Sequence, residues 1–296
     1  MARGRSGFGE ALRDLGGAFM PLALRRLRAE IDERLRKIPN DLNEYGYDPY
    51  GFSPQAAARQ VLPALLLYRY WFRVETHDIE RLPPGAALLV GNHAGQLPFD
   101  GAMLATALLM DADPPRIARA MGEYWIPTLP FASIGLARGG AMVGTPENCI
   151  RMLQRGEIAM VFPEGVRGMN KVYSQRYRLQ RFGLGFMRLA LAARVPVVPV
   201  AIVGSDDQQP GLANWKGLGR LLGMPALPIT PTFPWLGPLG LLPLPVKYRI
   251  YFGEPLRFDG DRSEEDASIQ QKVDVVRDAI ADMLARGRRE RRGIFA

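Results

Sequence analysis

One stretch of the chain, GAALLVGNHAGQLPFD at residues 85–100, joins a short apolar run to a polar loop and the start of a helix. Residues 86–90 are uniformly apolar and have the length of a buried strand, and residues 99–110 continue as an apolar segment of helical length. A strand that leads through a loop into a helix is the repeating unit of α/β domains. The stretch therefore predicts an α/β fold, in which we expect a mixed central sheet flanked by helices.

The same alternation continues along the chain on both sides of this stretch. Apolar runs predict further strands at residues 116–121, 158–162, 195–203 and 247–252. Apolar spacing predicts helices at residues 55–72, 186–193 and 263–286. Another helix begins at Thr145, which is a good N-cap, has Pro146 at its first position and ends before Gly156. We expect one domain over residues 74–296, preceded by a helical segment over residues 1–73.

The N-terminal segment has the pattern of a basic amphipathic helix. Apolar residues recur at helical spacing over residues 8–38, with arginines between them. Two interpretations fit equally well: a helix in the membrane interface with its arginines at the headgroups, or a helix packed on the domain. The uncharged run within residues 55–72 is too short to span a bilayer, and no apolar core of signal-peptide length precedes Arg25 and Arg26. We therefore expect a membrane-associating segment on a peripheral protein of the cytoplasmic face.

The chain carries a formal net charge of +8, which favours anionic partners. Phospholipid headgroups, acidic carrier proteins and nucleic acid all meet this requirement, and charge alone does not choose among them. The single cysteine, Cys149, excludes an internal disulfide framework and a multi-cysteine metal site, and it fits a reducing compartment. We expect Cys149 to be a small buried residue of a helix.

A second unusual segment, residues 221–246, contains no charged residue. Its apolar length suggests a membrane span, but prolines recur throughout it, and each removes a backbone donor and disrupts a helix. We therefore expect an irregular apolar loop. Such a loop either packs on the domain as a cover or offers apolar surface to lipid.

The chain has two histidines, and histidine is the usual general base near neutral pH. We expect His77 to be a surface turn residue, because it lies where a strand turns toward two prolines. His93 directly follows the apolar run 86–90, at a strand end where ligands bind in open α/β sheets. Asp100 lies one loop further on, where a carboxylate would fix the imidazole tautomer and stabilise its cation.

Two further groups of polar residues accompany glycines. The sequence PEGVRG directly after the run 158–162 places Glu164, Gly165 and Arg167 at another strand end, where glycine lets a ligand approach the backbone. The sequence GLARGG places Arg138 between glycines, which we expect to form a loop. Read separately, these are two ordinary loops with solvated arginines. Read together, they supply a carboxylate for hydroxyls and two guanidinium groups for phosphate.

These motifs, in this order, resemble the four sequence blocks of the glycerolipid acyltransferase superfamily, the lysophospholipid acyltransferases that make phosphatidic acid and related lipids. The blocks are Asn-His with a following Asp, then GLAR, FPEGVRG and VPVVPV. The likeness covers about residues 74–258 and ends with GEPL at residues 253–256. FPEG after an apolar strand is its specific part.

The resemblance implies an O-acyltransferase that moves a fatty acyl group from acyl-CoA or acyl carrier protein to a lysophospholipid or monoacylglycerol. It implies that His93 is the general base and Asp100 its partner. It assigns the acceptor site to Arg138, Glu164, Gly165 and Arg167. Direct attack on the thioester requires no metal, no cofactor besides this co-substrate and no covalent enzyme intermediate.

The spacing of the His and Asp departs from the family pattern. That pattern puts the aspartate where this chain has Pro98, and Asp100 follows two residues later. Gly95 and Pro98 give the longer loop a way to curl so that Asp100 still reaches the imidazole. The monoacylglycerol-acyltransferase-like branch tolerates such variation, which leaves open whether the acceptor is phosphorylated or neutral.

Two other functions compete with acyl transfer. A non-catalytic lipid-binding or membrane-recruitment protein on the same fold is consistent with the shifted aspartate and the large apolar loop. Nucleic-acid binding ranks third, because the basic tail at residues 286–292 has no associated recognition motif, and we expect no nucleic-acid partner. The expected partners are acyl-CoA or acyl carrier protein, the lipid acceptor and an anionic membrane surface.

Overall fold

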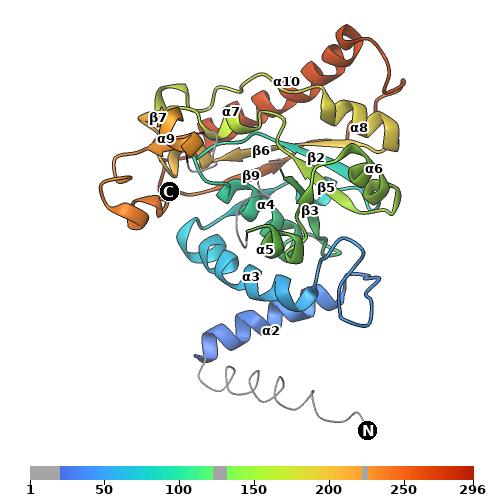
Figure 1. The fold of residues 1–296 in the computed structure, drawn as a ribbon, viewed down its shortest axis with the longest axis horizontal. Helices are drawn as coiled ribbons and strands as arrows, with labels where there is room; N and C mark the ends of the chain where they lie inside the picture. Colours follow the sequence, from blue (N-terminus) through green and yellow to red (C-terminus); the bar gives the residue numbers. More distant parts are fainter. Residues whose placement is uncertain (1–20, 123–131, 222–225) are drawn as a thin grey trace.

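A central sheet of seven strands organises the computed structural model, which describes residues 21–122, 132–221 and 226–296 (Figure 1). The strand order is β1-β9-β6-β2-β5-β3-β4. The strands are β1 (Glu75–His77), β2 (Ala87–Gly91), β3 (Ala118–Gly122), β4 (Met142–Val143), β5 (Ile158–Val161), β6 (Val197–Val203) and β9 (Arg249–Phe252). Neighbouring strands are parallel, except that β9 runs antiparallel to β6. The predicted mixed sheet is therefore confirmed.

Helices cover both faces of the sheet (Figure 1). One face packs against α2 (Leu22–Arg36), α3 (Pro54–Leu66) and α4 (Phe99–Met110), with α5 (Ala132–Arg138) beside α3. The other face packs against α6 (Pro146–Gln154), α8 (Gly185–Ala193) and α10 (Asp266–Glu290). Alternate residues of a strand point to opposite faces, so Leu89 of β2 joins the first core and Leu88 and Val90 join the second. Every residue of β2 is buried, as expected for a strand covered on both sides.

Helix α6 begins as its sequence predicts. The Thr145 side chain accepts a hydrogen bond from the Asn148 N–H at 3.3 Å, and Pro146 occupies the first turn. Gly156 follows the helix with a φ of +85°, a conformation that glycine adopts without strain. Cys149 is buried on the inner side of this helix, so its prediction as a buried helix residue is confirmed.

The N-terminal helices share a core with the rest of the chain. The apolar face of α2 is buried through Leu27, Ile31 and Leu35, in the same cluster as Leu89 of β2. For residues 22–36 the structure thus shows packing on the domain, while the first part of the predicted segment, residues 8–20, lies outside the described residues. Helix α3 continues into a π-helical turn, Leu67–Trp71, which completes the helix predicted at residues 55–72.

The uncharged segment is only partly irregular. Its β8 (Leu227–Ile229) pairs antiparallel with β7 (Ala213–Trp215), which follows β6, and a 3₁₀ helix spans Gly237–Leu241. The short α9 (Lys216–Leu221) precedes it. Apart from β8, the 3₁₀ helix and the last residue of α9, the described residues of the segment form turns and irregular backbone, so the predicted irregular loop is confirmed outside these short elements. Within the described parts of the chain, no helix is long and apolar enough to cross a membrane.

Candidate active site

The loop that carries His93 is fixed at the carboxyl end of β2. The Asn92 amide donates to the Ile202 carbonyl of β6 at 3.1 Å and accepts from the Ile202 N–H at 2.7 Å. The His93 ring stacks on Phe162, with ring centroids 4.5 Å apart and planes 21° apart. A Cβ at Gly91 would lie 2.9 Å from the Phe162 ring, so glycine makes room for this stack. Two neighbouring strands therefore set the position of the imidazole.

His93 and Asp100 form a buried hydrogen-bonded pair. The His93 Nδ1 lies 2.7 Å from Asp100 Oδ2, and Asp100 is fully buried while His93 is 8% exposed. The Ala94 N–H also donates to Oδ2 at 2.9 Å, and the Gly101 N–H donates to Oδ1 at 2.7 Å. A proton on Nδ1 that is donated to Asp100 leaves Nε2 of the neutral ring with its lone pair, ready to accept a proton.

The longer loop between the two residues curls as expected. Gly95 and Gln96 both have positive φ values, +94° and +62°. The Gln208 amide donates to the carbonyls of Gly95 at 2.8 Å and Leu97 at 3.0 Å, which holds the curl closed. Two adjacent residues in the left-handed conformation bend the backbone between His93 and Asp100 back on itself. Asp100 therefore reaches the imidazole despite its shifted position in the sequence.

Glu164 lies inside the protein, next to the His93 backbone. Its Oε1 accepts from the His93 N–H at 2.9 Å, its Oε2 accepts from the Gln180 N–H at 2.6 Å, and the residue is 1% exposed. Burial raises the pKa of this carboxyl, and the nearby Lys171 ammonium opposes the shift. The sequence predicts that Glu164 binds acceptor hydroxyls, but in the structure both of its oxygens hold backbone segments of the site.

A buried ion pair supports Glu164, and sequence reasoning missed it. The Lys171 Nζ lies 3.3 Å from Asp206 Oδ1 and 3.8 Å from Glu164 Oε2. Burial raises the pKa of Asp206, and Lys171 opposes that shift as well. A signal for Asp206 was present, because the polar sequence SDDQQ at residues 205–209 follows an apolar strand after a single glycine, Gly204. Lys171 carried no such signal.

The turn after Glu164 requires two glycines. Gly165 has a φ of +55° and precedes the short α7 (Val166–Met169). A Cβ at Gly168 would lie 2.7 Å from the His93 carbonyl oxygen and 2.7 Å from the Glu164 Cβ. The turn therefore packs directly against the His93 loop, and Gly165 serves the backbone conformation of that turn.

The two arginines of the predicted acceptor site lie in different surroundings. Arg167 is exposed on α7 and donates to the Arg181 carbonyl at 3.3 Å. Arg138 is the last residue of α5, and its guanidinium lies 5.9 Å from the Tyr47 ring centroid. The expected loop around Arg138 was wrong, because the glycines after it end a helix, with Gly140 at a φ of +103°. In the described residues, no hydrogen bond or ion pair joins Arg138 to the group around His93.

His77 lies at the end of the edge strand β1 rather than in a turn. Its ring stacks on Tyr251, with centroids 4.4 Å apart and planes 8° apart. The hydrogen-bonded pair with a buried carboxylate belongs to His93, as the sequence suggested.

Comparisons with known proteins show what the chain is similar to. The model of a family described as Acyltransferase matches residues 73–203. An uncharacterised protein of Mycobacterium tuberculosis is 41% identical over 259 residues, which cover 85% of this chain and 72% of that protein. A protein of Gallus gallus named "DGAT1/2-independent enzyme synthesizing storage lipids" is 27% identical over 207 residues, which cover 69% of this chain and 58% of that protein.

A solved structure, the 1-acyl-sn-glycerophosphate acyltransferase of Thermotoga maritima, covers 77% of this chain and 82% of its own, with a TM-score of 0.48 and 17% identity. The family match spans β1 to β6 and includes both His93 and Glu164. The similarity to the Mycobacterium tuberculosis protein extends across most of the chain. The chain therefore belongs to the acyltransferase family that this model describes.

Proposed function

We propose that the protein transfers a fatty acyl group from acyl-CoA or acyl carrier protein to a hydroxyl of a glycerolipid or lysophospholipid acceptor, with His93 as the general base. The observation that carries the proposal is the 2.7 Å contact between His93 Nδ1 and the buried Asp100. When Nδ1 carries the proton that Asp100 accepts, Nε2 is the proton acceptor. Family membership supports acyl transfer to lipids in general, and the pair supplies a chemical means for it.

The reaction requires one proton acceptor and no covalent enzyme intermediate. Nε2 of His93 takes the proton of the acceptor hydroxyl as its oxygen attacks the thioester carbonyl. The tetrahedral intermediate then collapses, the thiolate leaves, and the imidazolium returns the proton to the sulfur. Asp100 stabilises the transient cation through Nδ1, and such general-base catalysis contributes about 10²- to 10⁴-fold in rate.

The acceptor is a lysophospholipid or a monoacylglycerol. Arg167 is exposed beside the Glu164 turn, where its guanidinium is available to an acceptor phosphate. The name of the Gallus gallus relative refers to storage lipids, which supports testing a neutral acceptor next to a phosphorylated one. The experiment must therefore offer both.

We further propose that the protein acts as a peripheral protein on anionic membranes of the cytoplasmic face. Exposed apolar side chains recur in and beside the segments from β7 to the 3₁₀ helix, and these segments lie together at one end of the molecule (Figure 1). We call this set of side chains the apolar patch. Its members are Leu212, Trp215, Leu221, Trp235, Leu236, Leu239 and Leu242. The Trp71 indole donates to the Pro243 carbonyl at 3.0 Å, which ties the end of the N-terminal helices to this patch. Exposed Trp and Leu side chains favour contact with lipid, and the net charge of +8 on the protein favours an anionic lipid surface.

The test is acyl transfer by the purified protein. Labelled palmitoyl-CoA and palmitoyl acyl carrier protein are each offered with lysophosphatidate or monoacylglycerol in neutral detergent, and the lipid products are separated. We expect a labelled diacyl product with at least one donor and acceptor pair. Lipid binding without any product would favour the alternative, a non-catalytic lipid-binding protein on this fold.

A further inference from the structure

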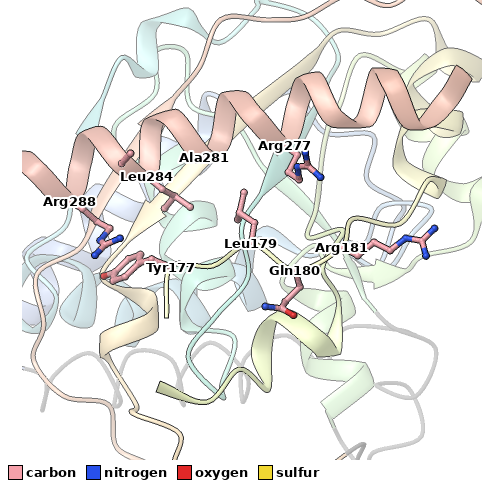
Figure 2. A pocket seen from close by; sticks show the side chains of 9 residues that line it. Tyr177, Leu179, Gln180, Arg181, Arg277, Ala281, Leu284 and Arg288 are labelled. Carbon is pink, nitrogen blue, oxygen red and sulfur yellow. The ribbon is translucent and has the colours of Figure 1, made fainter. Parts of the chain in front are cut away.

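A groove runs between α10 and the segment 177–181, which follows the Glu164 turn (Figure 2). Its volume is about 470 Å³, within the range of sites for small molecules. In Figure 2 the segment runs along the helix, with Leu179 pointing toward it, Arg288 beside Tyr177 at one end and Arg181 at the other. The buried Leu284 gives the groove an apolar wall.

Among the described residues, those that line the groove include three arginines and no carboxylate. Arg277 is already paired, with Asp274 at 3.1 Å and Asp278 at 3.1 Å. Arg181 and Arg288, both exposed, have no ion pair within the described residues, and the Arg288 guanidinium lies 4.9 Å from the Tyr177 ring centroid. Two arginines without carboxylate partners among the described residues thus lie at the two ends of a concave, partly apolar surface.

The segment that forms one wall is held in place by buried contacts. The Tyr177 hydroxyl donates to Asp207 at 2.6 Å, and the Gln180 N–H donates to Glu164 at 2.6 Å. The other oxygen of Glu164 accepts from the His93 N–H. The groove is therefore preformed, and a single carboxylate connects its wall to the catalytic loop.

We propose that this groove binds the phosphate-bearing end of a substrate, an inference that rests on the proposed function. Guanidinium groups match phosphate oxygens with two parallel hydrogen bonds, and the absence of lining carboxylates leaves that capacity free. Phosphate has two sources here, the nucleotide end of the thioester donor and the headgroup of a lysophospholipid acceptor. Arginines at both ends suit a ligand with separated phosphates, which favours the donor nucleotide.

The experiment compares the double variant Arg181→Gln/Arg288→Gln with the wild type in direct binding and in turnover. The matched control is Arg262→Gln, an exposed arginine before α10 and outside the groove. Calorimetry with free coenzyme A, and separately with lysophosphatidate in neutral detergent, measures binding without catalysis. We expect the double variant to bind one of these ligands with a Kd roughly tenfold higher or more, because it loses charge-assisted hydrogen bonds. The control should bind both ligands as the wild type does.

The two arms identify the phosphate source. A higher Kd for coenzyme A, with a higher KM for acyl-CoA when monoacylglycerol is the acceptor, assigns the groove to the donor. A higher Kd for lysophosphatidate, with an unchanged KM for acyl-CoA, assigns it to the acceptor. Unchanged binding of both ligands overturns the inference. Arginine-dependent binding in a protein without turnover would instead remove the proposed function and leave the groove a phosphate site.

Discussion

Two buried carboxylates at the site, Asp100 and Glu164, position His93 in different ways. Asp100 contacts the ring through Nδ1, so it sets the tautomer and the charge that the imidazole can carry. Glu164 contacts the backbone N–H of the same residue, so it sets where the ring lies. Asp100 thus acts on the proton of the imidazole, and Glu164 acts on its position. Substituting each carboxylate separately distinguishes these two effects.

Asp100→Asn should lower kcat by about 10²- to 10⁴-fold with little change in KM. An amide cannot stabilise the imidazolium, and its NH₂ group facing Nδ1 would favour the tautomer that carries the proton on Nε2. Steady-state kinetics with a fixed acceptor measure the effect, and circular dichroism checks the fold. A variant with wild-type kcat would show that the pair is structural.

Glu164→Gln should lower kcat roughly tenfold or more while leaving the acceptor KM unchanged, because small shifts of a catalytic group are costly. Glutamine replaces one accepting oxygen with an NH₂ group that faces a backbone N–H of His93 or Gln180. Kinetics over a range of acceptor concentrations separate the two roles. A raised acceptor KM with unchanged kcat would return Glu164 to the acceptor site.

At the scale of elements, short sequence patterns predicted those helices and strands that depend on neighbouring residues. The apolar run of β2 and the caps of α6 predict those elements because burial and capping act on nearby residues. The glycines around Arg138 misled because glycine ends a helix and opens a ligand loop for the same reason, its freedom at positive φ. The amphipathic pattern of α2 left two interpretations because a core and a membrane bury the same apolar face.

The burial of Cys149 on α6 gives a test of that helix. Burial raises the pKa of the Cys149 thiol to about 11, so at pH 8 only about a thousandth of it is the reactive thiolate. We expect a thiol reagent to leave the native protein unlabelled at pH 8 and to label it fully in denaturant. Rapid native labelling would contradict the burial of Cys149.

At the scale of the molecule, strand order brings the site together. His93 follows β2, Glu164 follows β5 and Asp206 follows β6, and β2 lies between the other two strands. The sequence predicts each strand end, but not which strands are neighbours, because pairing depends on contacts distant in sequence. The Lys171 ion pair was missed for that reason, since its partners come from two different strand ends.

The apolar patch at one end of the molecule predicts binding to anionic vesicles. Trp235→Asp with Leu239→Asp should lower vesicle binding several-fold, because both side chains are at least 70% exposed and their charged replacements resist burial in lipid. Val275→Asp, at an exposed position on α10, is the matched control and should bind as the wild type does. Vesicle sedimentation measures the effect. Equal binding by all three proteins would exclude the patch from membrane attachment.

The most direct measurement of the central claim is acyl transfer by His93→Ala beside His77→Ala. Both substitutions remove a stacked imidazole, but only His93 pairs with a buried carboxylate. With purified, folded proteins and the same thioester and lipid acceptor, we expect His93→Ala to lose about 10²- to 10⁴-fold in kcat and His77→Ala to stay near the wild type. Full activity in the folded His93→Ala protein would contradict the account.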